Sequence, residues 1–395
     1  MLYNEFQGEK LSALGFGAMR LPVLDDGSID QAHLDRMVDA AMAAGVNYFD
    51  TAHPYHGGKS EVCLGKSLAR YPRESWNLAD KFPGHQNVKG VRPVTPEGIF
   101  EEQLRRCGVD YFDFYLLHNV NENSLACYYG KPENRFMDYF LEQKAKGRIR
   151  HLGFSCHAAP AGLEQFLALY GRDVEFCQIQ LNYVDWTLQD AKRKCEILKE
   201  AGLPVWVMEP VRGGKLAAFD AETEARLRAL RPEESIPAWA FRWLRTLPKP
   251  TMILSGMSSL EQMEDNLKTF SEHKPLNEEE LALLSEIADR LSRQIPCTGC
   301  RYCCAGCPKE LDIPMLMSTA NDMAVAQSFN LVARYAALGP EKQAGACIGC
   351  GQCSRACPQK IDVPEQMRRL DALMASQKSW EEICRERAEA AAKGA

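Results

Sequence analysis

The sequence predicts an α/β protein, a (β/α)8 TIM barrel followed by a small, mainly helical domain that is rich in cysteine. Up to about residue 270, short β-rich apolar runs alternate with amphipathic segments. Eight such runs favour a closed barrel over an open doubly wound sheet. No Gly-x-Gly-x-x-Gly turn follows the first run, which argues further against a dinucleotide-binding open sheet.

The elements can be placed in order along the chain. Predicted strands cover Leu14–Met19, Val46–Asp50, Trp76–Lys81, Phe112–His118, Ile149–Ser155, Glu175–Leu181, Leu203–Glu209 and Thr251–Ser255. Predicted helices cover Gln31–Ala44, Pro96–Cys107, Phe136–Lys146, Pro160–Tyr170, Gln189–Glu200, Leu260–Phe270 and, more polar, Asn277–Arg293. We therefore expect a barrel domain over residues 1–272, a helical linker over 273–294, a cysteine-rich domain over 295–370, and a C-terminal helix or tail over 371–395.

Composition excludes several classes of protein. The 395 residues, 46% of them hydrophobic, suffice for one large and one small core. A net charge of −6 without a Lys/Arg-rich block argues against nucleic-acid binding. The N-terminus has no apolar leader and no stretch approaches eighteen apolar residues, so we expect neither export nor a membrane span. Cysteines grouped at metal-ligand spacing indicate a reducing cytoplasm.

Two cysteine runs repeat at an offset of fifty positions, each with the spacing C-x2-C-x2-C-x3-C-P. This spacing is typical of ferredoxins with two [4Fe-4S] clusters, in which the fourth cysteine of each run binds the other cluster. The predicted ligand sets are therefore Cys297, Cys300, Cys303 and Cys357 for one cluster, and Cys347, Cys350, Cys353 and Cys307 for the other. Structural zinc is the alternative, although zinc sites more often use two separated C-x2-C pairs.

Other features of this region are less specific. Cys304 falls outside the pattern and is interpreted as a packing residue. The segment 322–338 between the runs reads as helical. The module thereby resembles the helix-rich ferredoxin domains of the succinate-dehydrogenase type more than the minimal bacterial ferredoxin.

Four polar residues follow successive predicted strands, where the active site of a barrel lies. A lysine beside a tyrosine would lower the pKa of the phenol, and a carboxylate would keep the lysine charged. The tyrosine then acts as general acid, and a histidine orients a substrate carbonyl. Each residue also has an ordinary structural interpretation, but their joint position predicts catalytic Asp50, Tyr55, Lys81 and His118.

Two predicted loops could hold phosphate groups, because exposed amides and a helix N-terminus after the last two strands of a barrel bind anions. Ordinary glycine turns are the alternative. The residues concerned are Pro210, Gly213, Gly214 and Lys215 in one loop and Ser255, Gly256, Met257 and Ser258 in the other.

The order of the four catalytic candidates, within Asn-Tyr-Phe-Asp-Thr-Ala, Ala-Asp-Lys-Phe and Val-Asp-Tyr-Phe-Asp-Phe-Tyr-Leu-Leu-His, resembles the aldo-keto reductase family over residues 1 to about 272. The whole chain resembles the branch with a C-terminal ferredoxin-type domain. The resemblance implies a catalytic tetrad and an extended nicotinamide cofactor. It places Ala18, Met19 and Met208 near the ring, Ser155 and Gln178 at the carboxamide, and Gln262 and Asn266 around the adenosine. Because the family often has Arg where Gln262 stands, NADP(H) and NAD(H) both remain open.

We therefore expect an oxidoreductase that reduces a small carbonyl compound, or oxidises an alcohol, coupled to electron transfer through the clusters. A nicotinamide exchanges two electrons and a cluster one, so a flavin, a ferredoxin or a flavoprotein partner is one way to connect them. Two alternatives stay open: structural or regulatory clusters, and an electron-transfer subunit whose barrel only binds nicotinamide. The segment 119–135, with Tyr128 and Tyr129, is expected to cover the pocket mouth or form an interface.

Overall fold

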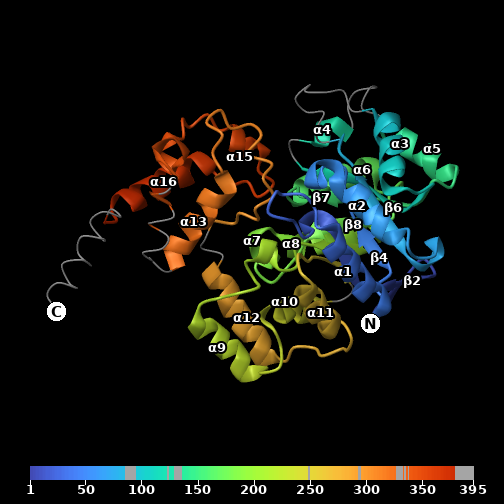
Figure 1. The fold of residues 1–395 in the computed structure, drawn as a ribbon, viewed down its shortest axis with the longest axis horizontal. Coiled ribbons are helices and arrows are strands. Elements are labelled where there is room, and N and C mark those ends of the chain that lie inside the picture. Colours follow the sequence, from blue (N-terminus) through green and yellow to red (C-terminus); the bar gives the residue numbers. More distant parts are fainter. Residues whose placement is uncertain are drawn as a thin grey trace. The chain divides into compact units, whose positions relative to one another are not determined.

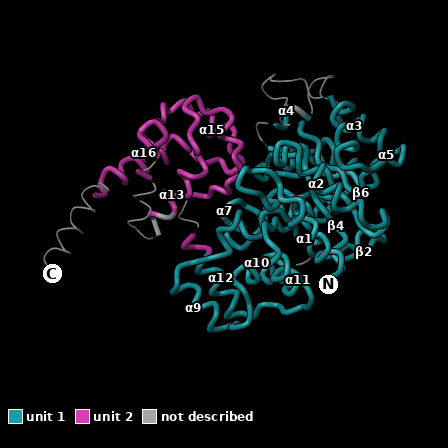
Figure 2. Tube along the Cα trace, in the orientation of Figure 1, with its two compact units in different colours: residues 1–287 teal, residues 288–395 magenta. Residues whose placement is uncertain are grey.

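The structure is a computed structural model, and it describes residues 1–84, 95–121, 124–128, 136–247, 250–291, 295–325, 332, 335–336 and 338–378. The chain divides into two compact units, residues 1–287 and 288–395 (Figure 2). In the described ranges, no helix combines the length and the apolar character that crossing a membrane requires.

The predicted barrel is confirmed in unit 1 (Figure 1). Among the described residues, eight parallel strands close on themselves in the order β10, β3, β4, β5, β6, β7, β8, β9. They are β3 (Leu14–Gly17), β4 (Tyr48–Asp50), β5 (Asn77–Phe82), β6 (Phe112–Val120), β7 (Ile149–Cys156), β8 (Cys177–Gln180), β9 (Val205–Met208) and β10 (Pro250–Gly256). Every predicted strand overlaps one of these, with ends shifted by at most two residues.

An antiparallel hairpin, β1 (Tyr3–Phe6) and β2 (Glu9–Ser12), precedes the barrel and was not predicted. Its two short, partly polar strands give little apolar signal. Phe6 packs edge-on against Trp206, with ring centroids 5.0 Å apart, and also contacts Phe114 and Phe176. Since these aromatic residues lie near the starts of their strands, the hairpin fills the N-terminal end of the barrel and leaves the opposite end for a site.

Helices surround the barrel, and all six that were predicted within it are present. They are α1 (Gln31–Ala43), α3 (Pro96–Cys107), α5 (Phe136–Ala145), α6 (Pro160–Tyr170), α8 (Ala191–Glu200) and α11 (Leu260–Thr269). The sequence motif of α3 shows why: Thr95 accepts a hydrogen bond from the Gly98 amide, Pro96 opens the helix, and Gly108 ends it in a left-handed conformation.

Further helices were not predicted, among them α2 (Lys59–Leu68), α9 (Ala221–Leu230) and α10 (Ile236–Thr246), with short α4 (Leu125–Tyr128) and α7 (Asp185–Leu188). Eight of the eleven residues of α10 are buried, among them Trp239, Phe241 and Trp243. The 3-10 helices are η1 (Ala18–Arg20), η2 (Tyr55–Gly58), η3 (Arg73–Ser75), η6 (Arg212–Gly214), η7 (Pro340–Lys342) and η8 (Ala344–Ala346).

The segment expected to be a helical linker contains α12 (Glu278–Leu291). Up to Ile287 this helix belongs to unit 1, where it lies beside α9 (Figure 1). Two ion pairs join the helices, Arg226 to Glu286 and Arg231 to Glu280, each at 2.6 Å. Most of α12 is therefore part of the barrel unit, while the predicted domain boundaries stay predictions.

Unit 2 is mainly helical, as predicted, with α13 (Ile313–Val325), α15 (Gln352–Ala356) and α16 (Val363–Ala375). The Asp-x-Pro repeat at an offset of fifty starts a helix in each half. Asp312 accepts a hydrogen bond from the Met315 amide, and Asp362 accepts one from the Glu365 amide, both at 3.3 Å. Most of the helix expected over 322–338, and the tail beyond residue 378, lie outside the described residues.

Candidate functional site

The four predicted catalytic residues lie at the C-terminal ends of three adjacent barrel strands. Asp50 ends β4, and Tyr55 opens η2 just after it. Lys81 and His118 lie near the ends of β5 and β6. The structure brings all four together, because Lys81 contacts both Asp50 and Tyr55, and the ring of His118 lies edge-on to that of Tyr55.

Lys81 and Asp50 form a buried ion pair. The Lys81 Nζ donates hydrogen bonds to Asp50 Oδ1 at 2.5 Å and to the carbonyl oxygen of Thr51 at 2.6 Å. The two side chains are 0% and 4% exposed. Burial raises the pKa of Asp50, and the charge of Lys81 opposes this shift. Because an isolated charge at this depth is costly, each residue supplies the countercharge that the other needs.

The pKa of Tyr55 departs from the sequence-based expectation. The Lys81 ammonium lies 5.1 Å from the centroid of the Tyr55 ring, close enough for a cation–π contact. We expected this lysine to lower the pKa of Tyr55, and that expectation is wrong. Burial raises this pKa well above its ordinary value, and Asp50 raises it further. Since Asp50 compensates the Lys81 charge, the phenol stays protonated, which is the form a general acid needs.

His118 is fixed through its backbone. Its ring lies edge-on to that of Tyr55, with centroids 6.0 Å apart and an interplanar angle of 81°. Tyr128 of α4 is 1% exposed and donates a hydrogen bond to the His118 carbonyl oxygen. The next residue, Asn119, has a φ of 60° and donates its amide proton to Ser155 Oγ at 2.8 Å. The buried Tyr128 thus stabilises the backbone that carries His118, while Tyr129 lies outside the described residues.

The residues expected around a nicotinamide ring lie at the same end of the barrel. Ser155, Gln178 and Met208 are on the neighbouring strands β7, β8 and β9, while Ala18 and Met19 follow β3 in η1. Gln178 Nε2 lies 3.7 Å from Met208 Sδ, and the buried Gln178 Oε1 has no hydrogen-bond partner among the described residues. A buried acceptor in this state is destabilising unless a ligand supplies a donor.

The loop after β9 has the irregular backbone expected of a phosphate loop. Pro210 follows the strand, and φ is 50° at Arg212, 65° at Gly213 and 93° at Gly214 before Lys215. Glycine tolerates such values, whereas Arg212 does not do so readily. The strained backbone at Arg212 therefore needs stabilising contacts from residues outside the turn.

The loop after β10 matches the prediction only in part. Ser259 caps α11, accepting a hydrogen bond from the Gln262 amide at 3.3 Å. Asn266 donates to Ser255 Oγ at 3.0 Å and is buried. Gly256 and Met257 lead to Ser258, whose amide donates to Gln262 Oε1 at 2.8 Å. A phosphate at that amide would have to displace the Gln262 side chain.

A buried polar network that the sequence reasoning missed joins the loops after β8 and β9. The carboxylate of Asp185, 0% exposed, accepts hydrogen bonds from Gln180 and Asn182 at 2.7 Å and from Arg212 Nε at 3.2 Å. Asn182 also donates to the carbonyl oxygen of Glu209, whose φ is 57°. The network therefore supports the strained loop. The available signal was the polar series Gln180, Asn182, Asp185 directly after a barrel strand.

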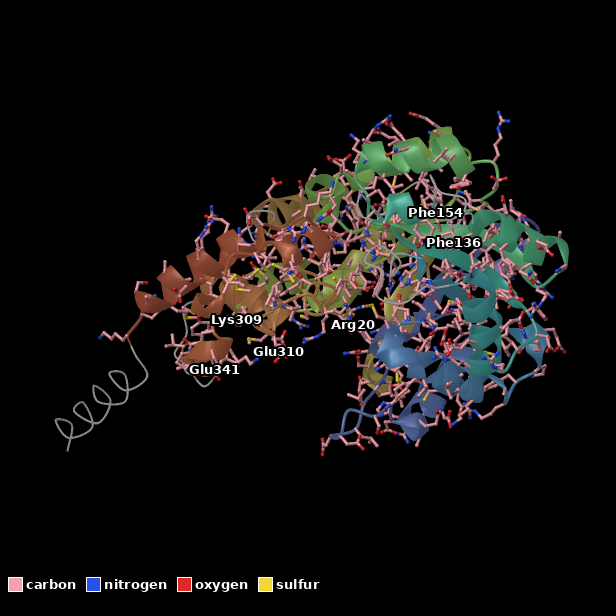
Figure 3. The ribbon with its side chains drawn as sticks, turned by 90° about the horizontal axis from the view of Figure 1, so that it is seen from above. Arg20, Phe136, Phe154, Lys309, Glu310 and Glu341 are labelled. Carbon is pink, nitrogen blue, oxygen red and sulfur yellow. The ribbon has the colours of Figure 1, made fainter. Side chains whose placement is uncertain are left out.

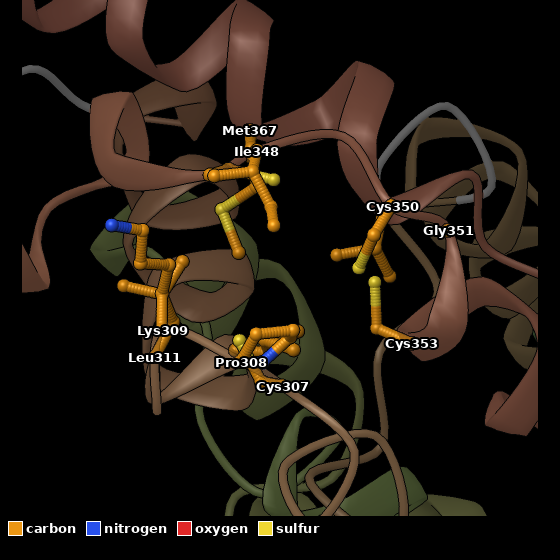
Figure 4. Close-up of a pocket in the computed structure, with 12 residues that line it drawn as sticks. Cys307, Pro308, Lys309, Leu311, Ile348, Cys350, Gly351, Cys353 and Met367 are labelled. Atoms are coloured by element: carbon orange, nitrogen blue, oxygen red, sulfur yellow. The ribbon is translucent and has the colours of Figure 1, made fainter.

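Unit 2 contains a pocket lined by cysteines of both runs. Cys307 of the first run lines it together with Cys347, Cys350 and Cys353 of the second (Figure 4). The pocket has about 350 Å³ of free space, its mouth included. Apolar residues such as Leu311 complete the lining. The grouping is the one expected if the fourth cysteine of one run serves the cluster of the other.

The remaining predicted ligands also lie near one another. Burial raises the pKa of Cys300 to about 12, and the neighbouring thiols of Cys357 and Cys297 add to the effect. Burial raises the pKa of Cys303 as well, with the same three thiols and Cys304 contributing. In the part of the chain that the structure describes, no three potential ligands are close enough for a single metal ion. Because Cys357 contributes to the raised pKa of both Cys300 and Cys303, it lies near the first three cysteines of the other run.

Comparison with family models assigns both units. The model described as "Aldo/keto reductase family" matches residues 13–289. The model described as "4Fe-4S dicluster domain" matches residues 296–361, a range that contains all eight predicted ligand cysteines.

Individual relatives are distant. "Probable aldo-keto reductase 1" of Glycine max is 25% identical over 232 residues, which are 56% of this chain and 64% of that protein, so this chain spans less than two thirds of it. "NADH-specific methylglyoxal reductase" of Escherichia coli is 25% identical over 331 residues, covering 72% and 96% of the two chains.

Solved structures show the same fold. A holo aldo-keto reductase from Bacillus halodurans has 24% identity and a TM-score of 0.55, covering 71% of this chain and 93% of that one. An aldo/keto reductase from Klebsiella pneumoniae, solved with NADP and acetate, has 21% identity and a TM-score of 0.58, with the same two coverages. At these identities the likeness concerns the fold alone.

Proposed function

Because the chain belongs to the aldo/keto reductase family, we propose that its barrel reduces a small carbonyl compound, or oxidises the corresponding alcohol, by hydride exchange with a nicotinamide. The observation that carries the proposal is the convergence of Asp50, Lys81, Tyr55 and His118 at one end of the barrel. A structural ion pair alone would not need a protonated tyrosine and a histidine beside it.

The proton transfer rests on Tyr55 and His118. A substrate carbonyl oxygen near both rings would accept a hydrogen bond from His118 and a proton from the Tyr55 phenol. The raised pKa of Tyr55 keeps that proton in place until the oxygen gains negative charge. In the reverse direction the same oxygen of Tyr55 would take up the proton of the alcohol.

Lys81 and Asp50 act on Tyr55 rather than on the substrate. The Lys81 ammonium, 5.1 Å from the ring centroid, favours the phenolate that forms as the proton leaves. Asp50 holds the ammonium in place through the 2.5 Å hydrogen bond. The ammonium therefore favours the developing phenolate, while Asp50, which raises the pKa of Tyr55, helps to keep the resting phenol neutral.

The residues present fit a nicotinamide. The unpartnered Gln178 Oε1 suits the amino group of its carboxamide, and the strained turn at Arg212–Gly214 is the candidate phosphate loop. When bound, the nicotinamide supplies or accepts the hydride. Gln262 carries no charge and is hydrogen-bonded to Ser258, which favours NADH over NADPH because a 2′-phosphate would lack a cation there. The printed name of the Escherichia coli relative makes methylglyoxal the first substrate to test.

The C-terminal module is proposed to carry two [4Fe-4S] clusters, each bound by the cysteine sets described above. Their thiols would need to be deprotonated to bind iron, and burial disfavours this in the absence of iron. When bound, the clusters exchange single electrons. Together with the hydride chemistry of the barrel, this supports an oxidoreductase that connects a two-electron substrate to one-electron carriers.

Replacing Tyr55 by Phe tests the barrel chemistry. The variant should lose about 10²-fold or more in kcat with methylglyoxal and NADH, with little change in cofactor affinity, because the proton donor alone is removed. Tyr111→Phe is the matched control, since Tyr111 precedes β6 at the other end of the barrel and its hydroxyl contacts Arg150. Unchanged kcat in Tyr55→Phe contradicts the role of general acid.

Electron coupling needs its own experiment. The full chain, purified without oxygen, is titrated with NADH and NADPH while the visible cluster absorption is followed. Bleaching supports exchange of electrons between barrel and module. Full carbonyl turnover without any bleaching contradicts the coupled function and leaves a carbonyl reductase with structural or regulatory clusters.

A further inference from the structure

The two cysteine runs repeat in sequence, but the residues around them differ. Position 298 is Thr298, 7% exposed, whereas its counterpart fifty positions later is Ile348, 59% exposed. Arg301 pairs with Asp312 at 3.1 Å, whereas its counterpart is Gly351. The second half therefore presents an apolar side chain to solvent beside its cysteines, where the first half has a buried threonine and an ion pair.

The pocket formed by Cys307, Cys347, Cys350 and Cys353 opens at this place. Cys350 is exposed, and Ile348 forms part of the pocket lining (Figure 4). Gly351 also lines the pocket, and a side chain there would meet only Arg355 Nη1, at 3.5 Å. A ligand in this pocket would thus lie near the surface of unit 2, next to an exposed apolar residue.

The rim of the pocket is basic, although the chain carries a net charge of −6. Lys309 is exposed and lines the pocket (Figures 3 and 4). Arg355 lies against Gly351, and Arg368, whose side chain is 73% exposed, is close enough to Cys347 for charge interaction. Glu365 pairs with both Arg368 and Arg369, at 2.6 and 2.8 Å, and Glu310, next to Lys309, pairs with Lys342 at 3.4 Å. With Asp362 near Arg368, three acids therefore stand beside five basic residues, and the rim keeps an excess of positive charge.

We propose that this basic rim, with Ile348 at its centre, is the docking surface for a small acidic one-electron carrier protein, and that the cluster held by Cys307, Cys347, Cys350 and Cys353 is the point at which electrons enter or leave the module. The inference rests on the proposed function of the module. Charge complementarity selects an acidic partner and speeds encounter, and the exposed isoleucine supplies a contact that excludes water.

The electron balance is simple. In each encounter the reduced carrier loses one electron and the cluster gains one, with no bond made or broken. The opposite half, with its buried Thr298 and paired Arg301, offers no comparable apolar contact.

The test uses the full, cluster-loaded chain and reduced flavodoxin, a small acidic flavoprotein, in anaerobic stopped-flow mixing. The variants are Lys309→Gln, Ile348→Thr, which introduces the residue of the other half, and the matched control Arg301→Gln. Iron content and reduction by dithionite show whether each variant keeps its clusters. Carbonyl turnover with NADH is measured separately.

We expect the second-order rate of cluster reduction by flavodoxin to fall about three- to tenfold in Lys309→Gln and Ile348→Thr, to change less than twofold in Arg301→Gln, and to decrease with salt in the wild type. Equal rates in all variants, or a loss only in Arg301→Gln, overturn the docking surface. If dithionite bleaches the clusters but reduced flavodoxin does not, the proposal of an acidic partner is overturned. Absence of iron in the wild type would instead refute the proposed function of the module.

Discussion

Lys81 donates a 2.5 Å hydrogen bond to Asp50 across the neighbouring strands β5 and β4, and its side chain is completely shielded from solvent. Replacing Asp50 by Asn leaves a buried ammonium without a countercharge. The free energy of unfolding should fall by about 3–5 kcal/mol, and kcat should fall because Asp50 no longer holds the Lys81 Nζ in place beside Tyr55. Urea unfolding and steady-state kinetics measure the two effects.

Glu200→Gln is the control for that experiment. Glu200 pairs with Arg193 at 3.3 Å, but its side chain is 68% exposed. An exposed pair contributes at most about 1 kcal/mol. If Asp50→Asn were no less stable than Glu200→Gln, the buried pair would not have the energetic role assigned to it.

The pH dependence of carbonyl reduction follows from Tyr55. Burial first, and Asp50 second, raise its pKa well above the ordinary value for tyrosine. The acid form is the active one, so activity is retained below the pKa and lost above it. We expect kcat/KM for reduction to be level from about pH 7 to about pH 9 and to decline only in more alkaline solution. A decline centred near pH 7 would show that Tyr55 has a lowered pKa.

The sequence predicted the fold closely because its signals are local. Eight β-rich runs and the caps of helices such as α3 depend on neighbouring residues only. The positions of Asp50, Lys81 and His118 followed from the same regularity, since strand ends of a barrel meet at one face. The hairpin β1–β2 was not predicted, because it is stabilised by the packing of Phe6 against aromatic residues far along the chain, such as Trp206.

The direction of the Tyr55 pKa and the role of Asp185 could not be obtained in this way. The pKa of Tyr55 depends on how far the negative charge of Asp50 offsets the positive charge of Lys81 and on how deeply the phenol is buried. Both depend on the three-dimensional structure. The role of Asp185 depends on Arg212, which lies 27 positions further along the chain and has a strained backbone conformation. The carboxylate of Asp185, from another loop, stabilises it by accepting a hydrogen bond from its side chain.

Asp185 should control cofactor affinity without touching the substrate. In Asp185→Asn, the buried guanidinium of Arg212 loses its countercharge, and the loop that follows β9 loses its anchor. We expect the Kd for the nicotinamide to rise about tenfold, equivalent to about 1.4 kcal/mol, with kcat at saturation within about twofold of the wild type.

Asp190→Asn is the matched control, because Asp190 is exposed and its φ of 49° suits asparagine. Fluorescence titration with the cofactor gives the Kd for each variant. A large loss of kcat in Asp185→Asn with an unchanged Kd would mean that Asp185 acts on the chemical step instead of on the cofactor loop.

The last prediction follows from the crosswise arrangement of the cysteines, in which the fourth cysteine of each run is proposed to bind the cluster of the other run. Cys357 belongs to the second run in sequence, yet it lies among Cys297, Cys300 and Cys303. Cys357→Ser should therefore disturb the same cluster as Cys300→Ser, and Cys307→Ser the same cluster as Cys350→Ser. Each variant should lose up to about half of the bound iron, and the electron paramagnetic resonance spectra of the reduced proteins should fall into these two pairs. Cys304→Ser should retain all the iron, since Cys304 lies outside the ligand pattern.

Spectra that instead pair Cys357→Ser with Cys350→Ser would assign each cluster to a single run, and the pocket shared by Cys307 and Cys353 would then have to be explained as packing alone.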